Sequence, residues 1–420
     1  MSDYLPFDLI TNILLRLPVA AILRCRGVCK PWLSLIDSPR FAKLQMDYSA
    51  ATTKNAALFV LEDDGCENGD LHFAPYIDGI RRETCLDFRS NPSSSAQVSV
   101  KIPRECVTLF GCCNGLLCFG LDFENAIITN PATRRSHVTP PLTNLLSFGS
   151  KGDCIYRYGC GFGYDSVSGD YKVVKVNQVL ESAEIEFSFH SELVSYGVRS
   201  NSSASMTFPY YLASAEKLGV FVGGAIHWLV HKEPYVRNVI VGFDLGRSEC
   251  REVPQPEYRH GESLSVRIGE LGKCLCIFAN YGDNGVDVWM MKEYGVRESW
   301  SVMLSVPHPG LCYDDGIRSL GFSTTGQEIL LQLDCKRLVW YDLKKNPGKD
   351  AAEEITIHGL EKKFMEAIVC FGSLVSPDGK FPSDELEVDK QQQKPRLLQK
   401  KKKKKKKRDD FLSTGFKLKL

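Results

Sequence analysis

The stretch Leu5–Phe41 reads LPFDLITNILLRLPVAAILRCRGVCKPWLSLIDSPRF and decides the fold of the amino-terminal region. Apolar residues recur at helical spacing from Leu9 onward, until Pro18 ends this segment. The same spacing then resumes, and Pro31 divides the second segment because proline is tolerated in the first turn of a helix but not in its interior. We therefore expect a helical domain over residues 1–46.

Two cysteines four residues apart raise the question of a metal or redox site in this stretch. Cys25 and Cys29 fall on the predicted apolar stripe beside Trp32, and no histidine lies nearby to complete a metal site. We interpret both cysteines as packing residues. No metal or cofactor is expected here or elsewhere in the chain.

A unit of two or three short helices is too small to bury its own apolar side chains. Covering ten such side chains at roughly 1.5–3 kcal/mol each would be a large driving force for contact with another surface. The helices are therefore predicted to form a docking module for a partner protein. The alternative is that they simply cap the domain that follows.

Composition and charge describe the remainder of the chain. The 420 residues are 43% hydrophobic and 25% charged, with no apolar run long enough to span a membrane. The amino terminus lacks the basic region of a signal peptide, so the sixteen cysteines are expected to be reduced in a cytoplasmic or nuclear protein. Residues 1–393 hold 39 Lys/Arg and 49 Asp/Glu, which argues against nucleic-acid binding by the body.

From residue 51 to residue 376 the pattern is typical of β-structure. Short runs such as AIHWLV, IVGFDL and LVWYDL carry β-branched and aromatic residues between turn residues. Asp244, Asp287 and Asp342 follow one another at 43 and 55 residues, close to the period of propeller blades. The expected fold class is α+β, with a mostly antiparallel all-β domain arranged as a β-propeller; a β-sandwich is the alternative.

Residues 377–420 form a polar segment that contains eight consecutive lysines, Lys400–Lys407. Such a composition cannot bury enough surface to fold, so a disordered tail is predicted. A nuclear-import signal and non-specific binding to nucleic acid are the functional interpretations of the lysines. An incidental, solvated segment is the simpler one.

The amino-terminal stretch resembles the F-box. The matching residues of its first part are Leu5, Pro6, Asp8, Leu9, Ile10, Ile13, Leu14, Arg16, Leu17 and Pro18. The later matches are Leu23, Arg24, Arg26, Val28, Cys29, Lys30, Trp32, Leu35, Ile36, Pro39 and Phe41. Ala21-Ile22 departs mildly from the usual Ser-Leu.

The β region resembles the F-box-associated interaction domain of plant F-box proteins, which is kelch-like. Its blocks here include GCCNGLLCFG, ITNPATRRS, GFGYDSVSGDYKVVKV and GVFVGGAIHWLV, and the matched core is 106–345. The Trp-Arg/Lys pair usual after ELVSYGVRSNSSAS is missing, which leaves the local packing there open.

The resemblance implies a non-catalytic subunit of an SCF-type ubiquitin ligase. The F-box would bind a Skp-type adaptor, and through it cullin and RING subunits, while the β domain holds an unidentified target protein for ubiquitination and proteasomal degradation. The expected adaptor-binding residues are Leu5, Pro6, Leu9, Ile13, Leu14, Leu17, Pro18, Val28, Cys29, Trp32, Leu35 and Ile36, some of which belong to the core of the F-box itself.

Two other functions stay open from the residues alone. The β domain is alternatively a sensor that binds a small ligand or a glycan, or a hydrolase with clustered acids or histidines. No nucleophile–base set or phosphate-binding loop supports catalysis, and His227 beside Trp228 reads as a packed, hydrogen-bonded histidine. Target recognition is expected in the loops 62–95, 141–157, 198–216, 254–263 and 305–316.

Overall fold

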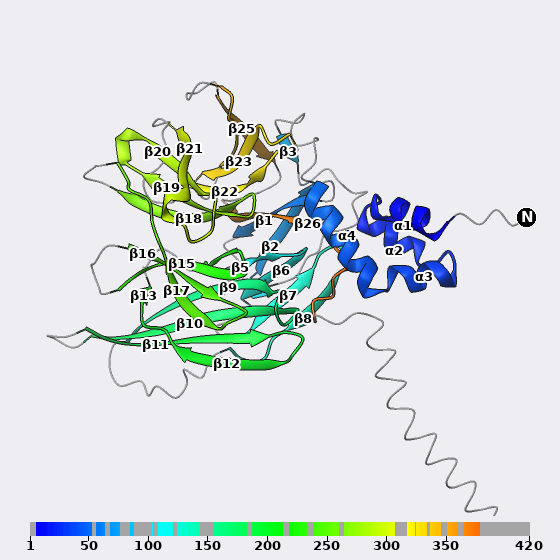
Figure 1. The fold of residues 1–420 in the computed structure, drawn as a ribbon, viewed down its shortest axis with the longest axis horizontal. Helices are drawn as coiled ribbons and strands as arrows, with labels where there is room; N and C mark the ends of the chain where they lie inside the picture. Colours follow the sequence, from blue (N-terminus) through cyan, green and yellow to red (C-terminus); the bar gives the residue numbers. More distant parts are fainter. Residues whose placement is uncertain are drawn as a thin grey trace, which may run out of the picture.

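The computed structural model begins with four helices that precede all the described strands (Figure 1). The helices are α1 (Phe7–Leu15), α2 (Val19–Cys25), α3 (Lys30–Ile36) and α4 (Pro39–Thr52). The structure describes residues 6–52, 56–63, 68–75, 85–87, 102–103, 108–120, 124–142, 154–182, 187–212, 218–232, 238–259, 264–306, 317–323, 325–333, 337–345, 351–358 and 364–378. Within these ranges no helix is long and apolar enough to cross a membrane.

The helix boundaries follow the proline positions in the sequence. Pro18 occupies the position before α2, and Pro31 lies in the first turn of α3, as predicted. Before α4, the Ser38 hydroxyl accepts a hydrogen bond from the Phe41 amide at 3.2 Å, which satisfies one of the free amides at the start of that helix. Helix α4 continues to Thr52, beyond the periodicity that the sequence shows.

The described strands form six sheets, which we call blades and number along the chain. Blade 1 contains β5 (Thr108–Cys113), β6 (Leu116–Gly120), β7 (Ala126–Asn130) and β8 (Arg135–Val138); blade 2 contains β9 (Cys154–Asp165), β10 (Asp170–Ser182), β11 (Phe187–Gly197) and β12 (Ser202–Thr207). Blade 3 contains β13 (Tyr211–Leu212), β14 (Val220–Val222), β15 (Ala225–His231), β16 (Asn238–Asp244) and β17 (Glu249–Val253).

Blade 4 contains β18 (Ser265–Leu271), β19 (Cys274–Asn280), β20 (Val286–Met291) and β21 (Trp300–Val306), with the short 3-10 helices η3 (Gly282–Asn284) and η4 (Arg297–Ser299) in its turns. Blade 5 contains β22 (Ile317–Phe322), β23 (Glu328–Leu333), β24 (Arg337–Asp342), β25 (Ala352–His358) and the parallel strand β3 (Cys85–Asp87). Blade 6 joins β26 (Phe364–Phe371) to β1 (Ala56–Asp63), β2 (Asn68–Pro75) and β4 (Ile102–Pro103).

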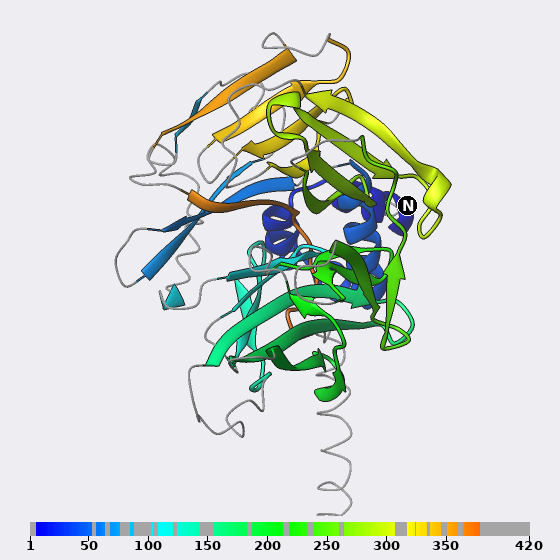
Figure 2. The same cartoon turned by 90° about the vertical axis from the view of Figure 1, so that its left-hand side faces the viewer.

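One strand from each blade takes part in a closed ring of contacts. In order, β5 contacts β9, β9 contacts β14, and the contacts continue through β18, β22 and β26 back to β5 (Figure 2). The ring closes because β1, which follows the helices, pairs antiparallel with β26 near the end of the described chain. Closure of this kind is the arrangement of a β-propeller and not of two packed sheets. The predicted propeller is confirmed, and the alternative sandwich is wrong.

Each pair of neighbouring blades encloses its own apolar cluster. Six clusters lie between blades 1 and 2, 2 and 3, 3 and 4, 4 and 5, 5 and 6, and 6 and 1 in the described residues. Middle strands are covered on both faces, so β6 and β7 are buried along their whole length, whereas the outer strand β12 is largely exposed. The body therefore completes its core by stacking blades around the ring.

The aspartate spacing used to predict the blades has a more specific origin. Asp244 and Asp342 end β16 and β24, which lie two blades apart. Asn130 likewise ends β7 of blade 1. Asp287, however, lies near the start of β20, so it is not equivalent to the other two, and the spacings of 43 and 55 residues are not the true repeat.

Candidate protein-binding site on the helices

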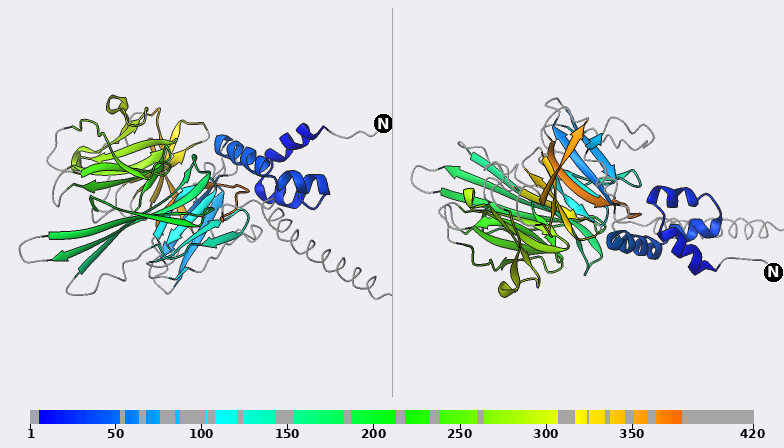
Figure 3. Two further views of the ribbon diagram at one scale, coloured as in Figure 1. Left: turned by 60° about the horizontal axis from the view of Figure 1, so that its bottom comes forward. Right: turned by 90° about the horizontal axis from the view of Figure 1, so that it is seen from above.

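Helices α1–α4, which we call the head, project from one end of the propeller, which we call the body (Figure 3). The head has a small core in which four side chains are almost wholly buried: Leu14, Ile22, Ile36 and Phe41. Partly buried side chains pack around it: Ile10, Leu15, Leu17, Cys25, Trp32, Leu35 and, from the body, Leu374. This core contains only a small part of the apolar side chains of the head.

Large apolar side chains that face solvent are concentrated in the head. Ten are found in the described residues, and six of them belong to helices or turns before residue 45. They are Phe7 (51% exposed), Leu9 (51%), Ile13 (52%), Val28 (63%), Leu33 (38%) and Leu44 (40%). Exposed apolar groups gathered in so short a segment are typical of a protein–protein interface. Leu9 and Ile13, four residues apart in α1, lie on one face of that helix.

The predicted adaptor-binding residues differ in exposure and fall into three groups. Leu14 and Ile36 are buried and support the head from inside. The exposed ones are Pro6, Leu9, Ile13, Pro18, Val28 and Cys29, and Leu17, Trp32 and Leu35 are half-buried. Leu5 lies outside the described residues.

Three exposed apolar residues were missed in the sequence: Phe7, Leu33 and Leu44. The F-box pattern leaves such positions variable, so the resemblance gives no reason to select them. An apolar side chain that falls off the regular stripe of an amphipathic helix is the signal that identifies them.

The interpretation of Cys29 as a packing residue is wrong. Cys25 does pack against the head core, but Cys29 is exposed at the position before α3. The reason is that α2 ends at Cys25, so the intervening turn breaks the helical phase that the sequence suggested. Cys29 is consequently on the surface of the head.

An ion pair holds the second and third helices together. The Arg26 guanidinium contacts the Asp37 carboxylate through two nitrogens, with Nε–Oδ1 at 2.7 Å and Nη2–Oδ2 at 2.8 Å. The pair combines one hydrogen bond, from Nη2, with a close charge contact at Nε. Arg26 is therefore held by Asp37 and is not a freely solvated cation.

The head is fastened to the body by the segment Gly372–Ser376, which we call the strap. Gln45 of α4 is fully buried and donates from Nε2 to the Gly372 carbonyl at 3.2 Å. Met46 packs against the cluster between blades 1 and 2, while Leu374 of the strap enters the head core. Contacts run in both directions, so α4 and the ring are firmly connected.

Asn130, in the Asn-Pro-x-Thr-Arg motif, anchors the strap to blade 1. Its side-chain nitrogen donates to the carbonyls of Ser373 at 3.0 Å and Val375 at 2.7 Å. Its side-chain oxygen accepts from the Ala132 and Thr133 amides at 2.9 and 3.2 Å, which closes the predicted turn.

A glycine gives the strap room beside blade 1. Gly115 has φ +82°, and a Cβ there would lie 2.4 Å from the Ser373 hydroxyl oxygen. Both the backbone conformation and the close approach require glycine. The GCCNGLLCFG block therefore serves the joint between head and body.

His227 is the packed, hydrogen-bonded histidine that the sequence suggests. It is 0% exposed, with Nδ1 3.0 Å from the Val220 carbonyl and Nε2 2.7 Å from the Tyr294 hydroxyl. Burial lowers the pKa of His227 to about 4, so the ring is neutral, donates from Nδ1 and accepts from Tyr294. This arrangement joins blade 3 to the turn after β20 and serves packing.

Of the loops expected to recognise a target, 141–157 and 305–316 lie mostly outside the described residues. The prediction of loops over 62–95 and 198–216 is partly wrong, because the first contains β2 and β3 and the second contains β12 and β13. The described end of the 254–263 loop is held by Arg259, which pairs with the buried Asp287 at 2.6 Å and covers the Tyr281 ring at 4.6 Å. Asp287 also accepts from Ser305 at 2.6 Å. These contacts order the base of the loop.

Comparisons with known proteins agree with this architecture. A model of the F-box domain matches residues 3–44, and a model of the F-box associated beta propeller domain matches residues 80–378. F-box protein CPR1 of Arabidopsis thaliana is 32% identical over 435 residues, covering 99% of each chain. The F-box/kelch-repeat protein At3g23880 of the same plant is 30% identical, covering 78% of this chain and 85% of its own.

F-box domains generally bind Skp-type adaptors in SCF complexes, and F-box proteins with a propeller are generally non-catalytic subunits that recognise substrates. Both domain models fall on the regions that the structure shows as helical head and β-propeller body. This chain therefore belongs to the family of F-box proteins that carry an F-box-associated β-propeller domain.

Proposed function

We propose that this protein is the substrate-recognition subunit of an SCF-type ubiquitin ligase of the cytoplasm or nucleus. The head docks a Skp-type adaptor, which brings the cullin and RING subunits, and the body holds one target protein. Ubiquitin is then transferred to the target, which is degraded by the proteasome. The observation that carries the proposal is the set of exposed apolar side chains on the head.

The mechanism is proximity and not chemistry on this chain. A target held on the body lies at a restricted distance from the ubiquitin-carrying enzyme, which raises the effective concentration of its lysines. The strap supports this, because Gln45 and Asn130 both bond to it and so limit movement of the head against the body. A firm joint preserves the orientation that proximity requires.

Binding of a purified Skp-type adaptor to the full chain tests the proposal. The double variant Leu9→Asp/Ile13→Asp places two carboxylates on the exposed face of α1, where burial against a partner would be very costly. We expect loss of measurable binding with unchanged thermal unfolding. Leu14→Asp is unsuitable because Leu14 is 0% exposed and the change would unfold the head.

Val302→Asp is the matched control, since Val302 is 43% exposed on β21 of the body. It should bind the adaptor like the wild type. If the α1 variant also binds normally, or if the wild-type chain does not bind a Skp-type adaptor at all, the proposal is wrong.

A further inference from the structure

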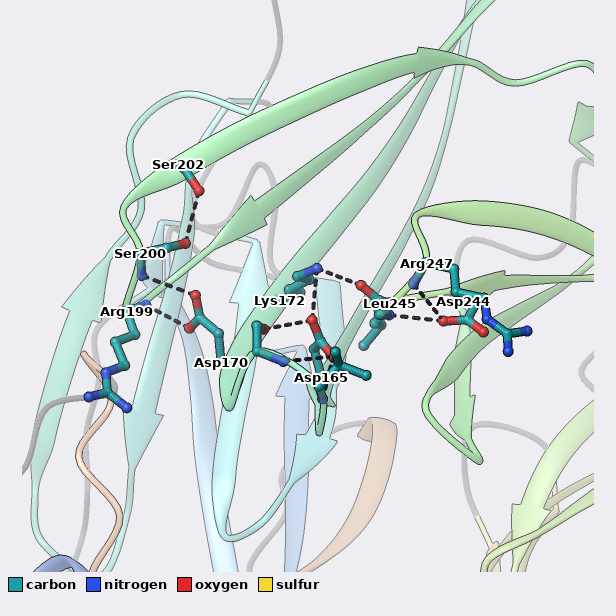
Figure 4. Close-up of polar contacts among 12 residues, drawn as sticks. Asp165, Asp170, Lys172, Arg199, Ser200, Ser202, Asp244, Leu245 and Arg247 are labelled. Atoms are coloured by element: carbon teal, nitrogen blue, oxygen red, sulfur yellow. Dashed lines mark hydrogen bonds and ion pairs between the residues drawn. The ribbon is translucent and has the colours of Figure 1, made fainter.

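Basic side chains recur where β7 turns into β8, β11 into β12 and β16 into β17. In blades 1 to 3 the exposed ones are Arg134, Arg135, Arg199 and Arg247, which we call the cationic arc. These turns lie at the end of the body that carries the head, because the turn of blade 1 includes Asn130, the anchor of the strap. Figure 4 shows the turns of blades 2 and 3 side by side.

The acidic residues of these turns are used internally. Asp170, 4% exposed, accepts hydrogen bonds from the amides of Arg199 at 2.7 Å and Ser200 at 3.0 Å (Figure 4). Asp244 accepts from the amides of Gly246 and Arg247 at 2.9 Å each. The carboxylates thus shape the turns, while the guanidinium groups of the same turns remain at the surface.

The turns of blades 2 and 3 are also held to each other. Lys172 lies 3.0 Å from the Asp165 carboxylate and donates to the Leu245 carbonyl. Burial by itself would raise the pKa of Asp165, but hydrogen bonds from Ser168 and Lys172 and the charge of Lys172 outweigh it, and the pKa is lowered. The turns of blades 2 and 3 are accordingly joined and not independent of each other.

An exposed apolar residue lies within the arc. Val167 is 83% exposed and sits over Gly246, where an added Cβ would come within 2.9 Å of its methyl group. A large apolar side chain flanked by arginines is the composition expected at a contact surface rather than at a purely solvated rim.

Charge on the head has the same sign. Residues 6–52 contain six Arg/Lys against three Asp, and one of those aspartates, Asp37, is paired with Arg26. Near the arc, the exposed Glu249 is paired with Arg251 at 2.9 Å. In blade 4, by contrast, Glu293 and Glu298 flank Arg297, so the arc ends at blade 3.

We propose that the cationic arc is a second contact surface for the adaptor docked on the head, and that the adaptor meets it with an acidic face. The inference rests on the proposed function. A protein partner fits better than nucleic acid, because the arc includes the exposed Val167 and lies at the end of the body that carries the head and its exposed apolar side chains. Charge complementarity at such a rim acts mainly on the rate of association and on its salt dependence.

The test is the double variant Arg199→Glu/Arg247→Glu of the full chain, measured for binding to a purified Skp-type adaptor at low and high salt. The turn hydrogen bonds use backbone amides, so the fold is retained, and thermal unfolding checks this. At low salt we expect association slowed about tenfold, with little salt dependence left. The neutral variant Arg199→Gln/Arg247→Gln should associate at a rate between those of the wild type and the Arg199→Glu/Arg247→Glu variant.

Lys232→Glu is the control, because Lys232 is an exposed cation that follows β15 at the opposite end of the body. It should associate like the wild type. If the Arg199→Glu/Arg247→Glu variant associates with the adaptor at the normal rate, the arc is not an adaptor contact. The same conclusion follows if the variant binds the adaptor normally but loses binding to a DNA oligonucleotide. In both cases the proposed function still stands if Leu9→Asp/Ile13→Asp abolishes binding.

Discussion

The head and the body handle their apolar residues in opposite ways. In the body, each blade is covered on both faces by its neighbours, and the pairing of β1 with β26 leaves no blade at an open end. In the head, four side chains form a core while six large apolar side chains remain exposed. A ring of blades can satisfy itself, whereas four short helices cannot, and this difference makes the head dependent on a partner.

The comparison also shows where the two regions are joined. Gln45 of α4 bonds to Gly372 across 327 residues of sequence, and Asn130 bonds to Ser373 and Val375. The strap thus shares its contacts between the head and blade 1. Variants in the body, in the joint and in the head should therefore have effects that decrease in that order.

The largest effect is expected from Trp228→Ala in the body. Trp228 is 0% exposed between blades 2 and 3 and donates from Nε1 to the Cys160 carbonyl at 3.3 Å. Removing the ring leaves a cavity and should cost about 4 kcal/mol of unfolding free energy, measured by urea denaturation. Trp32→Ala, in the half-buried position of the head, should cost clearly less. Equal losses in the two variants would contradict the comparison.

The joint is tested by Asn130→Ala. The change removes the donor to two buried carbonyls and the acceptor that closes the turn, so we expect a loss of about 3 kcal/mol in unfolding free energy. Hydrogen exchange should speed up in α4 as well as in the turn after β7. Asn130→Asp keeps the acceptor but loses the donor, and it should be as damaging as alanine. Faster hydrogen exchange confined to the turn after β7 would show that the strap does not transmit the change at Asn130 to α4.

Lowering the pH should affect the stability of the body differently from that of the head. His227 has a folded pKa of about 4, below its ordinary 6.5, so the unfolded chain binds more protons between these values. Stability is complete above pH 6.5 and falls as the pH drops towards 4, by up to about 3 kcal/mol. His227→Gln should remove most of this slope in urea titrations at several pH values. His190→Gln, at an exposed position, should keep it.

Adaptor binding offers a second measurement of the same contrast. Residues 1–52 contain no histidine, so no such titration affects the head in this range. Provided that the body is still folded, the affinity of the head for its partner should change little between pH 7 and pH 6.

The contrast between head and body also explains which parts of the structure the sequence predicts. The helices were predicted because prolines and apolar spacing act locally, and the propeller followed from repeated strand blocks such as AIHWLV and IVGFDL. The strap and the pairing of β1 with β26 join residues about 300 apart, for which local patterns carry no signal. That Leu14 is buried while Leu9 is exposed likewise depends on packing, since both are leucines on the same short helix.

The smallest effect is expected at the Arg26–Asp37 pair in the head. Both side chains are partly buried, at 35% and 23% exposed, and they meet through two contacts. Arg26→Ala should therefore cost about 1 kcal/mol of local stability, read as faster hydrogen exchange in α2 and α3. Arg26→Lys keeps the charge but not the two-point contact, and it should restore less than half of the loss.

Arg251–Glu249 in the body is the matched pair, with one contact at 2.9 Å and both side chains 58% exposed. Because solvent screens such a pair, Arg251→Ala should leave hydrogen exchange in blade 3 unchanged. A greater effect in the body than in the head would mean that the large ring depends on surface ion pairs while the small helical unit does not. That outcome is the reverse of what the two cores imply, since the unit with fewer buried side chains has more to lose from each fixed contact.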